Sequence, residues 1–153
     1  MGVVVAIQVS ADKAAALAPA ESAQLVAGHG IVGDRYFNKS GTFSKKRGED
    51  RQITLIEEEA LAAALSDYGV VVTGPDSRRN VVTRGVALNH LVGKMFRVGA
   101  CVLEGVELCE PCGHLAKLTG NDRVRAALVH RGGLRARICE GGTVRVGDEI
   151  VLG

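Results

Sequence analysis

The sequence predicts a mainly β domain with a few short helices (α+β), folded as a closed or partly closed β-barrel. Many short runs rich in β-branched residues are separated by glycine turns, and few segments have a helical period. Closure is favoured because a barrel leaves no unpaired edge strand. With 153 residues, 46% of them apolar, the chain is long enough to bury its own core. We therefore expect a single domain over residues 1–153.

Strands are expected in four places along the chain. Residues 3–9 and 51–56 are apolar runs with β-branched residues. Residues 96–105 and 144–153 each contain a strand, a glycine turn and a second strand, which is typical of hairpins. The chain contains no linker, low-complexity tract or domain-scale repeat that would divide these strands between domains.

Two segments are expected to form helices. Residues 57–69 have apolar residues at positions i, i+3, i+4 and i+7, which indicate a helix: Leu61, Ala64, Leu65 and Tyr68. Gly69 is expected to end that helix. A second helix is predicted within residues 121–130, with Asn121 or Asp122 as its N-cap.

Composition and charge exclude several classes of protein. The formal net charge is only +2 and the chain has five aromatic residues and no Trp, so neither a strongly basic face nor a base-stacking surface is expected. The N-terminal apolar run, residues 3–7, is too short to be a signal peptide or a membrane span. Four cysteines without a secretory signal are typical of thiols in a reducing compartment. We expect a cytoplasmic protein that binds neither nucleic acid nor membrane.

One glycine-rich stretch combines an acid and a base within ten residues. It reads GHGIVGDRYF, residues 28–37, and contains Gly33, Asp34 and Arg35. Glycine allows the backbone to approach a ligand closely, and the two charged side chains suit a polar substrate. The alternative interpretation is a tight loop closed by an Asp–Arg pair.

Two further stretches are rich in arginine. DSRRNVVTRG, residues 76–85, contains Arg78, Arg79, Asn80 and Arg84, and HRGGLRA, residues 130–136, contains His130 and Arg131. Arginine forks suit phosphate and carboxylate groups. Either loop is also consistent with a solvated surface. Taken with the glycine-rich stretch, they predict a pocket that binds an anion.

The stretch LCEPCGHL, residues 108–115, offers three interpretations. Cys109 and Cys112 have the spacing of half a zinc site, but no second knuckle follows. A thioredoxin-like redox pair would need a βαβ context that is not evident. Cys112 follows a proline and precedes a segment whose helix amides would favour a thiolate, so it is the candidate reactive cysteine. Cys101 and Cys139 are most simply core residues.

Four of these motifs together resemble the MOSC domain, which is found at the C-terminus of molybdenum cofactor sulfurases and as stand-alone bacterial proteins. They are GIVGDR, RQITLIE, RRNVVTRGVALNHLVGKMFRVG and LCEPCGHL, and the resemblance covers roughly positions 28–150. It implies a β-barrel-like fold and a reactive cysteine at Cys112, acting as a catalytic sulfur or a molybdenum ligand. The family is associated with binding the molybdenum cofactor or delivering sulfur to it. That cofactor ends in a phosphate, which suits the arginines.

The resemblance leaves several functions open. The chain is expected either to bind the molybdenum cofactor (molybdopterin) or to carry sulfur as a persulfide. A full sulfurase has a pyridoxal-phosphate domain, and 153 residues leave no room for one, so no pyridoxal phosphate is expected on this chain. Its partner would be a sulfur donor, such as a cysteine desulfurase, or a molybdoenzyme acceptor. The alternatives are a cofactor-dependent reductase of N-hydroxylated compounds, a non-enzymatic binding module and a zinc-knuckle protein.

Overall fold

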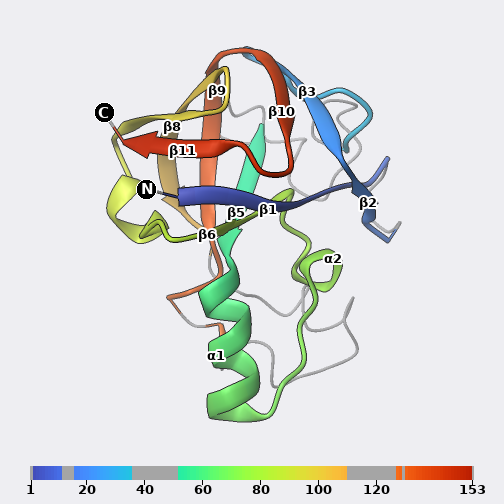
Figure 1. Ribbon diagram of the computed structural model, residues 1–153, viewed down its shortest axis with the longest axis vertical. Helices are drawn as coiled ribbons and strands as arrows, with labels where there is room; N and C mark the ends of the chain where they lie inside the picture. Colours follow the sequence, from blue (N-terminus) through green and yellow to red (C-terminus); the bar gives the residue numbers. More distant parts are fainter. Residues whose placement is uncertain (1, 12–15, 36–51, 110–126, 129, 153) are drawn as a thin grey trace.

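The computed structural model describes residues 2–11, 16–35, 52–109, 127–128 and 130–152. Within these residues the chain is mostly β with two α-helices and a short 3-10 helix (Figure 1). The elements follow in the order β1 Gly2–Val9, β2 Ala18–Ala20, β3 Ser22–Val26, β4 Gly30–Ile31, β5 Ile53–Glu57, α1 Glu58–Tyr68, α2 Gly74–Ser77, β6 Val81–Arg84, η2 Leu88–Leu91, β7 Met95–Val98, β8 Cys101–Leu108, β9 Leu134–Glu140, β10 Gly142–Arg145 and β11 Glu149–Leu152.

Seven of the described strands form a closed barrel, as the sequence predicts. Their order is β1, β11, β7, β8, β9, β5 and β6, and β6 pairs with β1 to complete the ring. All neighbours in the ring are antiparallel except β5 and β6, which are parallel and are connected through α1. β2 is added outside the ring beside β1, and a separate sheet has the order β10, β3, β4.

The core has two parts on opposite sides of the barrel wall. The interior is filled by side chains that are almost fully buried, among them Phe96, Leu103 and Leu134. A second cluster lies between the outer face of β5 and β6 and α1, and it includes Ile56 and Val82. Because successive side chains in a strand point to opposite faces, β5 and β6 supply both clusters and are buried on both sides.

Helix α1 is confirmed, but only part of its row of apolar residues is buried. Ala60 and Ala64 are buried, whereas Leu65 is 54% exposed and Tyr68 is 42% exposed. Small alanines allow the helix backbone to approach the barrel closely, and this turns the larger residues toward solvent. Gly69 ends the helix as predicted: it adopts φ 65° and its N–H donates to the carbonyl of Leu65 at 2.9 Å.

One of the two predicted hairpins is confirmed and the other is wrong in its pairing. β7 and β8 pair across a turn at Gly99, as expected for residues 96–105. The strands expected in 144–153 are present, but β10 pairs with β3 whereas β11 pairs with β1 and β7. The sequence locates strands by their side chains, but the partner of a strand depends on packing that is not local. Most of the helix predicted within 121–130, including Asn121 and Asp122, lies outside the described residues.

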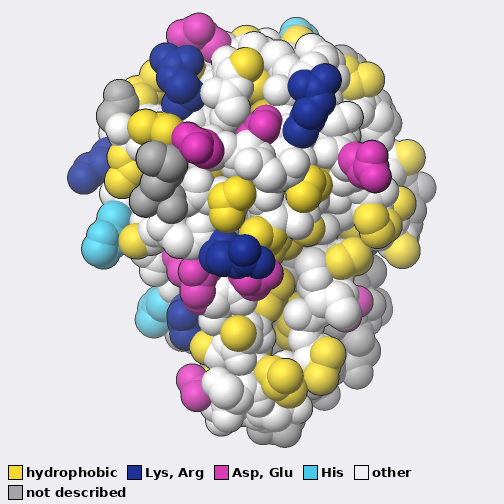
Figure 2. Space-filling view, viewed as in Figure 1, with side chains coloured by type: hydrophobic (Ala, Val, Ile, Leu, Met, Phe, Trp, Pro, Cys, Tyr) yellow, Lys and Arg dark blue, Asp and Glu magenta, His cyan; other side chains and the backbone are white. Residues whose placement is uncertain are grey.

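The surface in Figure 2 is mixed in character. Lysine and arginine side chains are interspersed with acidic ones over this face, and hydrophobic side chains gather between α1, α2 and β1. In the part of the chain that the structure describes, no helix is long and apolar enough to cross a bilayer.

The buried face of α1 is tested by two neighbouring substitutions. Ala64→Leu should lower the free energy of unfolding by about 1–3 kcal/mol, because the added methyl groups overpack the interface with the barrel. Leu65→Ala should change it by no more than about 0.5 kcal/mol, because the side chain is mostly exposed. Urea denaturation measures both changes. A loss of more than about 1 kcal/mol for Leu65→Ala would contradict the exposed position of that side chain.

Candidate functional site

A buried polar cluster joins the end of β1, the beginnings of β5 and β6, and the turn after β4. At its centre is Asp34, which is 0% exposed. Its Oδ1 accepts hydrogen bonds from the backbone N–H of Ser10 at 3.1 Å, from Arg35 Nη1 at 3.2 Å and from Asn80 Nδ2 at 3.2 Å. Arg35 is itself 4% exposed, so this is a buried ion pair supported by neutral donors.

Asn80 connects the cluster to three strands. Its Oδ1 accepts from the backbone N–H of Thr54 at 3.1 Å and from the Thr54 hydroxyl at 3.2 Å. Its Nδ2 also donates to the carbonyl of Gln8 at 3.3 Å. Asn80 is 0% exposed and Thr54 is 2% exposed, so neither side chain can bond to bulk water. The bonds between them satisfy their polar groups instead. The side chain of Asn80 therefore fixes where β6 begins relative to β1 and β5.

The same cluster holds the backbone of the two arginines before β6. Arg35 Nη2 donates to the carbonyl of Arg78 at 2.7 Å, and Gln8 Nε2 donates to the carbonyl of Arg79 at 2.7 Å. Arg78 follows α2 as its C-cap and adopts φ 63°, a left-handed conformation that is strained for a residue with a long side chain. Strained backbone of this kind persists only where the surroundings determine it, and it clusters at functional sites.

Arg79 reaches from this loop to the turn before β9. Its Nε donates to the carbonyl of Gly132 at 2.6 Å, and the next residue, Gly133, accepts from the backbone N–H of Cys109 at 2.8 Å. Gly133 has φ 112°, and a Cβ there would overlap the Leu55 carbonyl oxygen. Among the described residues, no acceptor is bonded to the two terminal nitrogens of Arg79. The loops containing residues 78–80, 109 and 132–133 therefore meet at one place.

His130 and Arg131 belong to this turn, and both are exposed. His130 adopts φ 59°, and its carbonyl accepts from Asn89 Nδ2 at 2.8 Å. His130 and Arg78 are the two residues other than glycine with positive φ among those described. The side chain of Arg131 forms no ion pair with another described residue.

Two predicted site residues lie apart from this meeting point. Arg84 is at the opposite end of β6 from Asn80, where its Nε lies 2.8 Å from Glu58 Oε1. The hydrogen bond from Arg84 lowers the pKa of Glu58. Gly33 precedes the buried Asp34, is exposed and adopts φ 85°, with open space where a Cβ would be.

The described cysteines do not have the properties of a reactive thiol. Burial raises the pKa of Cys101, which is 0% exposed. Partial burial and then the charge of Glu104 raise the pKa of Cys139, although Cys139 is exposed. Cys109 is 3% exposed. Cys112 lies outside the described residues, and within those that are described no three His, Cys, Asp or Glu side chains form a group that would hold a metal.

Sequence reasoning missed Gln8, Gln52 and Thr54, all of them buried polar residues. Gln52 Oε1 accepts from the backbone N–H of Ile138 at 2.7 Å, and so joins the start of β5 to β9. The available signal was a polar residue in an otherwise apolar strand, because such a side chain must find partners when it is buried.

The buried ion pair is tested by Asp34→Asn. This substitution removes the negative charge that is paired with the buried Arg35 guanidinium, so the free energy of unfolding should fall by about 3 kcal/mol. Asp67→Asn on the exposed end of α1 is the matched control and should change it by less than about 0.5 kcal/mol. Urea denaturation of the two variants makes the comparison. A loss below about 1 kcal/mol for Asp34→Asn would show that the pair does not stabilise the cluster.

Thiol alkylation as a function of pH tests the described cysteines. Near neutral pH, Cys139 should react more slowly than a free cysteine, because a raised pKa leaves less thiolate. Cys101 should react only when the protein unfolds, because it is fully buried. Mass mapping of the labelled peptides gives each rate separately. Half-maximal labelling of Cys139 below about pH 8.5, the value for free cysteine, would contradict the assignment.

Comparisons with known proteins identify the family. The sequence model of the MOSC domain matches residues 42–151. A comparison with curated protein sequences found no match.

Solved structures provide an independent comparison of the fold. The chain is similar to the YuaD protein of Bacillus subtilis, with a TM-score of 0.78 and 20% identity over 98% of this chain and 94% of that one. It is also similar to YiiM of Geobacillus stearothermophilus, with a TM-score of 0.76 and 17% identity over 100% and 75% of the two chains. YiiM of Escherichia coli gives 0.66 and 16% over 97% and 70%. The structures support the barrel, and the family model, which covers most of the sequence, shows that the chain belongs to the MOSC domain family.

Proposed function

We propose that this protein binds the molybdenum cofactor, holding its phosphate with Arg79 and Arg131 and placing its molybdenum near the sulfur of Cys112. MOSC domains are associated with this cofactor, and the residues of the chain fit its phosphate. The observation that carries the proposal is the guanidinium of Arg79, which is held in place through Nε while its two terminal nitrogens have no acceptor among the described residues.

The environment of Arg79 is suited to a phosphate. The bond from Nε to the Gly132 carbonyl fixes the plane of the guanidinium, so its terminal donors point in a defined direction. The side chain is half-buried, which strengthens a charge-assisted bond compared with one in bulk water. Two parallel donors match the geometry of phosphate oxygens.

The neighbouring turn adds positive charge. Arg131 directly precedes Gly132, whose carbonyl accepts the hydrogen bond from Arg79 Nε, so the Arg79 side chain is bonded to the residue next to Arg131. Arg131 is exposed and forms no ion pair with the described residues, and His130 lies beside it. Two arginines near one point attract a dianionic phosphate more strongly than either does alone.

The other predicted site residues act by positioning in this proposal. Asp34, Arg35 and Asn80 are bonded to one another and to the backbone, and they hold the carbonyl of Arg78 in place. Gly33 provides the left-handed turn before Asp34. Arg84 is assigned to the ion pair with Glu58 rather than to the cofactor.

The position of Cys112 in the sequence supports its role. It follows Cys109 by three residues, and three residues of chain span at most about 11 Å. The backbone of Cys109 is bonded to Gly133, next to the carbonyl that holds Arg79. When bound, the cofactor would supply redox-active molybdenum, for which a cysteine thiolate is a soft ligand.

Cys112 could instead receive sulfur as a persulfide. In that case a sulfur donor such as a cysteine desulfurase would load the cysteine, and a molybdoenzyme would accept the sulfur. The metal, pterin and sulfur contents of the purified protein separate this function from cofactor binding.

The first test is the composition of protein purified from a molybdenum-replete host. We expect molybdenum and pterin in near-equal amounts in the wild type and in Cys109→Ser. Cys112→Ser should lose the molybdenum while its circular dichroism spectrum is unchanged. If Cys112 carries a persulfide and the protein contains no molybdenum, the function is sulfur carriage and not cofactor binding. Zinc that is lost equally in both cysteine variants would overturn the proposal in favour of a zinc site.

The second test concerns the two arginines. Arg79→Lys and Arg131→Ala should each weaken retention of the pterin by at least about tenfold, because each removes charge-assisted bonds to phosphate. The loss for Arg131→Ala should shrink as salt concentration rises, since salt already screens its contribution in the wild type. Arg84→Ala is the matched control, with the same residue type on the same segment but paired with Glu58. Pterin fluorescence after gel filtration measures retention, and equal effects in all three variants would contradict the assignment.

A further inference from the structure

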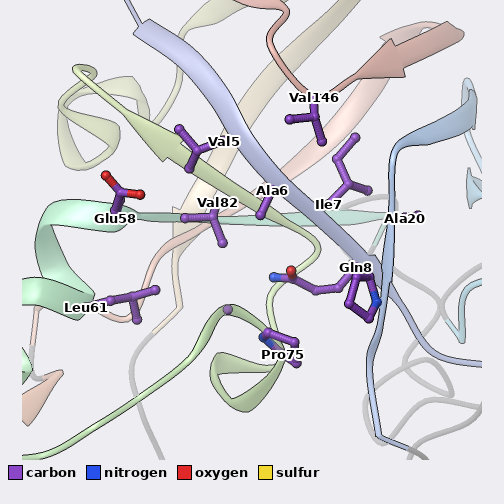
Figure 3. A pocket seen from close by; sticks show the side chains of 12 residues that line it. Val5, Ala6, Ile7, Gln8, Ala20, Glu58, Leu61, Pro75, Val82 and Val146 are labelled. Atoms are coloured by element: carbon purple, nitrogen blue, oxygen red, sulfur yellow. The ribbon is translucent and has the colours of Figure 1, made fainter.

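A groove on the outer wall of the barrel is separate from the candidate site. It lies along β1 between α1 and α2, and its volume is about 400 Å³ (Figure 3). Most of its lining is apolar and comes from separate parts of the chain that the fold brings together, among them Val5, Ala6, Leu61, Pro75, Val82 and Val146. Figure 2 shows hydrophobic side chains gathered over the same region.

A side-chain oxygen of one residue that lines this groove has no hydrogen-bond donor among the described residues. Gln8 lines the groove and is 1% exposed. Its Nε2 donates to the Arg79 carbonyl at 2.7 Å, and this bond settles the orientation of the amide, because an oxygen in that position would face another oxygen. Oε1 is therefore the free end of the amide, and no described residue donates to it. The wall beside it is Gly74, where an added Cβ would be 3.0 Å from Oε1.

The described residues of the groove present no unpaired charge to an ion. Glu58 is the one charged residue among the described residues that line the groove, and its carboxylate is paired with Arg84. A charged ligand would lose its hydration without gaining an opposite charge, which disfavours it. An apolar ligand with a single donor would bury its surface and also bond to Gln8 Oε1, for which the described residues supply no donor.

We propose that this groove binds a small, uncharged, ring-containing molecule that donates one hydrogen bond to Gln8 Oε1. A volume of about 400 Å³ is near the lower end of the range for small-molecule sites, about 300–1,000 Å³, and suits one or two fused rings. The site is distinct from the cofactor site proposed above and does not depend on it.

Gln8 also links the groove to the loop of Arg79. The same amide faces the groove with Oε1 and holds the Arg79 carbonyl with Nε2. A donor at Oε1 polarises the amide and strengthens the bond that Nε2 makes. Occupancy of the groove therefore stabilises the backbone of the loop that carries Arg79.

Indole is a suitable probe, and 1-methylindole is its matched control without the N–H donor. In an NMR titration of the full chain, indole should give saturable shifts at Val5, Ala6 and Val82, and a smaller shift at Arg79. Its affinity should exceed that of 1-methylindole by about fivefold, as expected for one neutral hydrogen bond. Equal affinities, shifts at other residues, or no saturation by indole would each overturn the proposal.

A substitution that fills the groove provides an independent test. Ala6→Leu should weaken indole binding at least about tenfold, whereas Ala62→Leu, on an exposed position of α1, should leave it unchanged. If Ala6→Leu does not fold, Gly74→Ala replaces it, because its Cβ would lie 3.0 Å from Gln8 Oε1 and 3.2 Å from Val82 Cγ2. Indole binding equal to that of the wild type in a folded groove variant would contradict the site. None of these variants alters a residue proposed to bind the cofactor, so cofactor retention is measured separately.

Discussion

The side chain of Asn80 is the constraint on which the candidate site depends. It is completely buried, yet it bonds Thr54 on β5, the backbone of Gln8 on β1 and the carboxylate of Asp34. A buried amide has few ways to satisfy both its oxygen and its nitrogen, so its neighbours are held in one arrangement. The parallel pair β5 and β6 needs this, because the connection between them runs through α1 and α2 and does not itself set the register.

The consequences of that arrangement extend to the arginines. Asp34 holds the buried Arg35, and Arg35 in turn binds the carbonyl of Arg78. This hydrogen bond supports the left-handed backbone conformation of Arg78, which costs on the order of 1–3 kcal/mol for a residue other than glycine. The result is that Arg79 reaches the Gly132 carbonyl across the start of β9. The sequence is consistent with a solvated surface position for Arg79. In the fold its guanidinium is instead held in place where the loops meet.

Strand β1 contributes side chains to both the interior core and the outer cluster of the barrel. Ile7 contributes to the interior core, while Val5 and Ala6 pack against the outer cluster beneath α1. Gln8, at the end of the strand, binds the Arg79 loop and also lines the outer groove. A polar residue in an apolar strand is tolerated here because its Nε2 is hydrogen-bonded within the protein.

The sequence by itself determined the class of fold, the approximate places of the main strands, the helix that ends at Gly69, and the family. These depend on local patterns: β-branched runs, glycine positions and the order of short motifs. It did not determine which face of α1 is buried. Ala60 and Ala64 are buried and Leu65 is exposed because of how the helix backbone packs against the barrel. Nor did it distinguish the arginines. Arg35, Arg79 and Arg84 have the same side chain but different partners. Arg35 binds the neighbouring aspartate and a carbonyl 43 residues away. Arg79 binds a glycine carbonyl 53 residues away, and Arg84 binds a glutamate 26 residues away. Only the tertiary structure decided which guanidinium is bonded within the fold and which has terminal N–H donors without an acceptor among the described residues. Hydrogen bonding depends on distances that only the folded chain sets.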